Sequence, residues 1–143
     1  MSELALHFEG LQLVVTLVSH QIEEKGKPYL DWLHCRVIIT VPSFTGQVDW
    51  SVMPKELINL SDDLQSLYDH FPAQGSLHFK PVEPNVELSF EIATLGHVVG
   101  EYCLRNDFLE CPVLKGPFCI DQSYIPGLVG GLRAFVKEAI NAP

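Results

Sequence analysis

The chain has 143 residues, of which 47% are hydrophobic and 10% aromatic, a content that fits one packed domain over residues 1–143 and excludes a disordered polypeptide. Eighteen acidic residues against nine basic residues give a formal net charge of −9, which disfavours nucleic acid and anionic membranes as partners. The apolar run at residues 11–18 is far shorter than the roughly 20 residues of a membrane span, so we expect a soluble, cytoplasmic protein.

Three strands and a helix are expected in the first half of the chain. Residues 11–19 are rich in β-branched and aliphatic side chains, while residues 32–41 and 47–52 alternate apolar and polar side chains as half-buried strands do. A helix is expected from about residue 54 to 71, because a proline suits its first turn and Ser51 is a candidate cap. Its apolar stripe consists of Leu57, Leu60, Leu64, Leu67, Tyr68 and Phe71.

The second half is expected to contain four more strands and a second helix. Apolar and polar residues alternate strictly over residues 86–92, and residues 97–104 return after a Thr-Leu-Gly turn. Shorter strands are expected at residues 77–79 and 116–120, and a helix at about 123–140 with Ser123 as its cap. The buried stripe of that helix consists of Leu128, Val129, Leu132, Phe135, Val136 and Ile140. The elements predict an α+β fold, with a mostly antiparallel sheet of about six to seven strands and two helices packed on one face.

No set of residues typical of catalysis or of metal binding stands out. The six histidines do not pair with one another or with cysteine at ligand spacing, and the phosphate-binding, nucleophile-elbow and zinc-protease motifs are absent. The cysteines at 35, 103, 111 and 119 form no Cys-x-x-Cys, so we expect reduced, structural thiols. We therefore expect a protein without catalytic residues, metal or cofactor.

Several short segments, in order, resemble the WapI-like family of bacterial immunity proteins. They are residues 32–37 (WLHCRV), the helix at 57–68, residues 83–88 (EPNVEL), residues 96–98 (GHV), residues 121–126 (DQSYIP) and residues 132–133 (LR). The resemblance spans about residues 11 to 140, while the cysteine content and the loop at 107–115 depart from the family. It implies a non-enzymatic protein that binds and neutralises a cognate toxin domain. The acidic surface suits a basic partner, such as a nuclease.

Four outward carboxylates are the expected contacts with that toxin: Asp49, Glu87, Glu91 and Glu101. The alternation places Glu87 and Glu91 on the wet face of one strand, with Glu101 on its neighbour. Two alternatives remain open, a small-molecule carrier with a pocket between sheet and helices, and a hydrolase that uses the carboxylates. A homodimer is also possible, although we expect Trp32 to be buried beneath a second layer and not to form an exposed contact.

Overall fold

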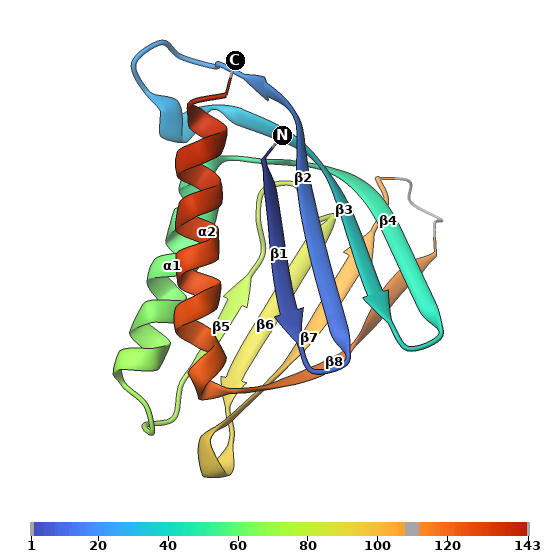
Figure 1. The fold of residues 1–143 in the computed structure, drawn as a ribbon, viewed down its shortest axis with the longest axis vertical. Helices are drawn as coiled ribbons and strands as arrows, with labels where there is room; N and C mark the ends of the chain where they lie inside the picture. The colour runs from blue at the N-terminus through green and yellow to red at the C-terminus, as the bar shows by residue number, and fades with distance from the viewer. Residues whose placement is uncertain (1, 108–111, 143) are drawn as a thin grey trace.

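The computed structural model describes residues 2–107 and 112–142, in which eight strands form two antiparallel sheets (Figure 1). Sheet A has the order β1 (Glu3–Phe8), β2 (Leu11–Gln21), β3 (Trp32–Val41) and β4 (Phe44–Val52). Sheet B has the order β5 (Ser76–Phe79), β6 (Val86–Ile92), β7 (His97–Arg105) and β8 (Val113–Asp121). Helix α1 (Pro54–Asp69) follows sheet A, and helix α2 (Ile125–Ile140) follows sheet B. The α+β class is confirmed, but the strands divide between two sheets of four and do not form one sheet of six or seven.

The first strand, β1, was not expected from the sequence. Its residues alternate between buried Leu4, Leu6 and Phe8 and exposed Glu3, Ala5 and His7. That pattern is typical of a strand with one face on the core. With β1 in place, the same order of elements, four strands and then a helix, occurs twice along the chain.

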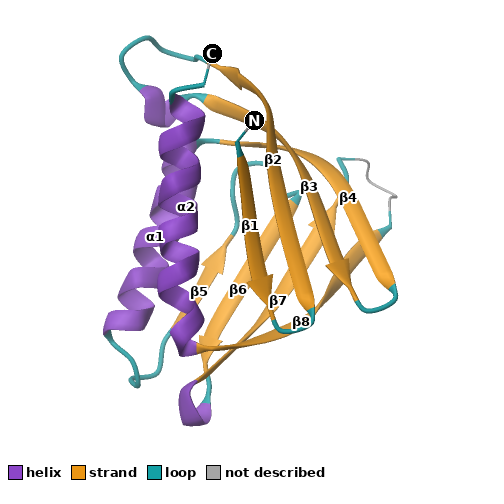
Figure 2. Ribbon diagram, viewed as in Figure 1, coloured by secondary structure: helices purple, strands orange, loops and turns teal. Residues whose placement is uncertain are grey.

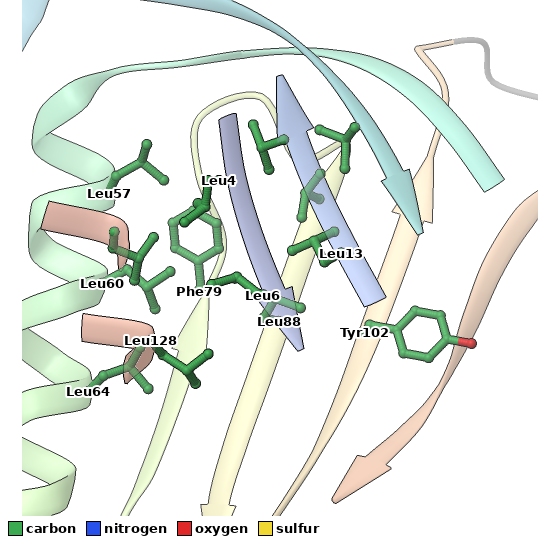
Figure 3. Close-up of a cluster of buried hydrophobic side chains, with 14 of the residues drawn as sticks. Leu4, Leu6, Leu13, Leu57, Leu60, Leu64, Phe79, Leu88, Tyr102 and Leu128 are labelled. Carbon is green, nitrogen blue, oxygen red and sulfur yellow. The ribbon is translucent and has the colours of Figure 1, made fainter. Parts of the chain in front are cut away.

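The buried faces of the two sheets pack directly on one another. Phe8 on β1 stacks on Phe118 on β8, with ring centroids 4.7 Å apart, and Trp50 on β4 meets Phe79 on β5 edge-on at 6.1 Å. Leucine side chains of both helices complete the same apolar cluster (Figure 3). Because the inner faces meet, the outer faces of sheets A and B point away from each other.

The two helices pack side by side along one edge of the molecule (Figure 2). Among the strands, α2 packs mainly on β1 and β2, whereas α1 packs mainly on β5, the first strand of sheet B. The predicted apolar stripes are largely correct, but Tyr68 is exposed and α1 ends at Asp69.

The helix starts differ from the caps that the sequence suggested. Ser51 lies in β4, and the first turn of α1 is instead closed by Glu56, whose carboxylate accepts a hydrogen bond from the backbone N–H of Met53 at 3.0 Å. Ser123 lies in a short 3-10 turn before α2, and its N–H donates to the carboxylate of Asp121 at 2.9 Å. In both cases an acidic side chain satisfies backbone donors that a helix start leaves free.

A β-bulge at Val18 changes which side chains of β2 face inward. Leu17 pairs with Cys35, but the next paired residue is Ser19, opposite His34. The extra residue turns His20 to the buried side, opposite Leu33, where a strict alternation would have placed it outside. Trp32 lies on the outer face of sheet A, half-buried, so the expectation that a second layer covers it is wrong.

Candidate partner-binding surface

The outer face of sheet B carries three of the four carboxylates that the sequence singled out. Val86, Leu88, Phe90 and Ile92 are buried on the core side of β6, which turns Glu87 and Glu91 outward. Glu101 is exposed on β7, directly opposite Ser89, whose hydroxyl accepts a hydrogen bond from the backbone N–H of Glu101 at 3.2 Å. The alternation of two neighbouring strands therefore gathers Glu87, Glu91 and Glu101 on one surface.

The three carboxylates differ in how far other side chains neutralise them. Glu87 is only 17% exposed, and its oxygens lie 3.3 Å from Nε2 of His78 and 3.8 Å from a guanidinium nitrogen of Arg105. Glu91 and Glu101 are exposed, and within the described part of the chain neither takes part in an ion pair. Their charges are the ones that a partner would meet first.

The surface around Glu91 and Glu101 is shallowly concave. A hollow of about 500 Å³, open to solvent, is lined by residues of all four strands of sheet B, including His78, Val99 and Pro117 besides the two carboxylates. A smaller hollow of about 70 Å³ adjoins it near Glu87. We call the outer face of sheet B, with these hollows, the acidic face.

Two basic residues and a thiol lie at the other end of the acidic face. Arg105 donates to Sγ of Cys103 at 3.2 Å, and this contact, together with the nearby carboxylate of Glu87, raises the pKa of Arg105 above its ordinary value. Lys115 on β8 is the cross-strand neighbour of Cys103. The acidic face thus has a carboxylate end near Glu91 and a mixed end near Arg105.

Asp49 does not join this cluster. It lies on β4, on the outer face of sheet A, where it is paired with Arg36 on β3 at 3.8 Å. Because the outer faces of the two sheets point away from each other, one compact partner surface would not cover both Asp49 and Glu91. The sequence could not show this, since local alternation identifies a wet face but not the sheet to which the strand belongs.

The alternative functions find little support in the same geometry. The space between sheets and helices, where a carrier would hold its ligand, is filled by side chains such as Leu57, Leu64 and Leu88 (Figure 3). The carboxylates of the acidic face lie in a shallow, open hollow and not in the closed cleft that a hydrolase would need. Among the described residues, no group of three or more His, Cys, Asp or Glu side chains could hold a metal ion.

Three cysteines belong to the described residues, and all three are free thiols. Cys35 is buried in the core, and this burial raises the pKa of its thiol to about 12. Cys103 and Cys119 lie half-buried on the acidic face, whereas Cys111 lies outside the described residues.

In the part of the chain that the structure describes, neither α1 nor α2 has the length and apolar character needed to cross a membrane.

A scan against protein families matches residues 6–139 to the model described as the immunity protein WapI-like family. The chain belongs to the WapI-like immunity protein family. The match spans both sheets and most of both helices, so the resemblance seen in the short sequence segments extends over nearly the whole fold. A search of curated proteins finds no match.

A search of solved structures finds the plant transcriptional regulator PBF-2. It shares 8% sequence identity with this chain, with a TM-score of 0.43, over 96% of this chain and 80% of that one. At this level the similarity carries no argument about what this WapI-like protein binds.

Proposed function

We propose that this WapI-like protein is an immunity protein that binds a cognate toxin domain in the cytoplasm and neutralises it by occlusion, without chemistry of its own. The observation that carries the proposal is the family match over residues 6–139. The open, shallow character of the acidic face supports it, because such a surface suits contact with a protein better than enclosure of a small substrate.

We place the toxin contact on the acidic face, with Glu91 and Glu101 at its centre and Glu87 at its side. The net charge of −9 and the exposed carboxylates of Glu91 and Glu101 favour a basic toxin domain, such as a nuclease. Opposite charges on the two partners would speed their encounter and fix their register. Asp49, on the other sheet, would contribute only to the long-range field.

The test is the affinity of this chain for the toxin domain encoded by the neighbouring gene. Glu91→Lys with Glu101→Lys is expected to weaken binding at least about tenfold, mainly through slower association, whereas Asp49→Lys is expected to change it by less than about threefold. Raising the salt concentration should reduce the difference between the wild type and the double variant.

Two results would contradict different parts of the proposal. If the double variant bound as tightly as the Asp49→Lys control, the assignment of the contact to the acidic face would be wrong. If the wild-type chain neither bound nor inhibited the toxin, the proposed function itself would fail.

A further inference from the structure

The hairpin between β6 and β7 ends in an unusual residue. Leu95, in the short turn Thr94–Gly96, is 92% exposed, whereas the other exposed large apolar residues in the described chain are at most 67% exposed. Its backbone has φ 60° and ψ 35°, the left-handed conformation. Figure 1 shows this hairpin end projecting beyond the neighbouring elements of the fold.

Among the described residues, no packing of the side chain accounts for a leucine at this position. A left-handed backbone is unfavourable for a residue with a Cβ, and glycine or asparagine avoids much of that cost. Isolated exposed apolar residues are ordinary, but a positive φ is uncommon for a residue other than glycine. Ser43, the other described non-glycine residue with a positive φ, is polar and so suits a solvent-exposed turn.

The turn that presents Leu95 is supported from behind. Side-chain atoms of Phe71 and Gln122 lie within 4.0 Å of the position that a Cβ on Gly96 would occupy. The backbone N–H of Ala93 donates to the carbonyl of His97 at 2.8 Å, which closes the hairpin. The backbone of the turn is therefore supported, so binding of the Leu95 side chain would order little additional backbone.

The surroundings of Leu95 carry negative charge only, apart from histidine. Residues 66–77, 91–101 and 117–124 include the hairpin and the segments that support it through Phe71 and Gln122, and they contain no Lys or Arg. Their acidic residues are Asp69, Glu91, Glu101 and Asp121. The backbone N–H of Ser123 donates to Asp121 and lowers the pKa of that carboxyl, which keeps it charged. A surface that accepts Leu95 would accordingly be apolar at its centre and basic around it.

We propose that Leu95 is the apolar anchor of the toxin interface, inserting into an apolar pocket that the toxin domain rims with Lys or Arg side chains. This inference rests on the proposed function and adds to it the shape and chemistry of the partner surface. The basic rim would face Glu91, Glu101 and Asp121, which continues the interface from the acidic face to the hairpin end. A few well-buried residues commonly supply most of the affinity of such interfaces.

The test measures the stability of Leu95 variants separately from their affinity for the toxin domain. Leu95→Asn and Leu95→Gly suit the left-handed backbone, so the midpoint of thermal unfolding should be unchanged or higher, while affinity for the toxin domain encoded by the neighbouring gene should fall at least about tenfold. The loss should appear mainly as faster dissociation, and Leu95→Met should retain most of the binding. Ser43→Gly, the matched control on the β3–β4 turn, should bind as the wild type does.

Two outcomes would overturn the inference in distinguishable ways. If Leu95→Asn and Leu95→Gly bound the toxin domain as tightly as Ser43→Gly, Leu95 would be no anchor, although the proposed function would stand. If the wild-type chain itself failed to bind, both the proposed function and the anchor would be rejected.

Discussion

Nε2 of His20 lies 2.6 Å from Oδ2 of Asp31, and the two side chains are only 5% and 3% exposed. Nδ1 of the same ring lies 3.2 Å from the carbonyl oxygen of Ala142, which joins β2 to the end of the chain beyond α2. Both partners are acceptors, so the ring donates to at least one of them. The bulge at Val18 makes this arrangement possible, because it turns His20 inward.

We expect Asp31→Ala to lower the free energy of unfolding by about 2–4 kcal/mol, because it leaves a buried histidine without its closest acceptor. Urea denaturation measures the change, and hydrogen exchange at residues 136–142 should report a looser end of α2. Asp63→Ala, on the exposed side of α1, is the control and should change stability by less than about 0.5 kcal/mol. Equal stabilities of the two variants would show that the pair contributes nothing.

The carboxylate of Glu56 joins α1 to the loop before β6. It accepts hydrogen bonds from the backbone N–H of Met53 at 3.0 Å and of Val82 at 2.8 Å. Glu56→Ala should therefore cost about 1–2 kcal/mol of stability and speed hydrogen exchange at the Val82 amide, with Glu56→Gln intermediate. Lys55→Ala, one residue away and exposed, should leave that amide protected. Unchanged exchange at Val82 in Glu56→Ala would refute the role.

Substitution by alanine should change the stability of the protein in opposite directions at Gly100 and at Gly130. A Cβ on Gly100 would clash with the carbonyl oxygen of Ser89 and with the ring of Phe118, so Gly100→Ala should destabilise the protein by about 3 kcal/mol. A Cβ on Gly130, on the exposed side of α2, meets nothing within 4 Å, so Gly130→Ala should stabilise the helix by about 1 kcal/mol. Thermal unfolding of both variants checks the signs, and a neutral Gly100→Ala would contradict the packing of β7.

Burial of Cys35 makes stability fall at alkaline pH. Its thiol pKa is raised from the ordinary value of 9.0 to about 12, so between these values the unfolded chain has lost a proton that the folded chain retains. The unfolding free energy should then decrease as pH rises above about 9, by at most about 1.4 kcal/mol per pH unit from this group. Cys35→Ala removes the contribution, so the difference in stability between wild type and variant should shrink from pH 8 to pH 10.5. If the unfolding free energies of the wild type and of Cys35→Ala changed in parallel with pH, the raised thiol pKa of Cys35 would be contradicted.

Local patterns predicted much of the secondary structure. The strands expected at residues 32–41 and 86–92 agree with β3 and β6, because each alternates strictly between a buried and a wet face. Both helices followed from their apolar stripes, with boundaries wrong by about two residues. The same alternation is present in β1, where Leu4, Leu6 and Phe8 are buried, so this strand was also predictable from the sequence.

Other features depend on contacts that no local pattern contains. Alternation shows that Asp49 and Glu91 each lie on a wet face, but the separation of those faces follows from the packing of sheet A on sheet B. The inward position of His20 depends on the single extra residue of a bulge, which is indistinguishable in sequence from regular strand. The strain at Leu95 likewise appears only in the backbone angles.

The packing of α1 on β5 and of the two sheets on each other has a consequence for how the molecule holds together. Neither run of four strands and a helix covers its own apolar faces, so each would expose most of its core if it were isolated. A single cut in the connection at residues 70–75 should therefore yield two fragments that stay associated, and each fragment alone should aggregate. Each half of the chain therefore depends on the other half to bury its apolar side chains, although a single short connection joins them.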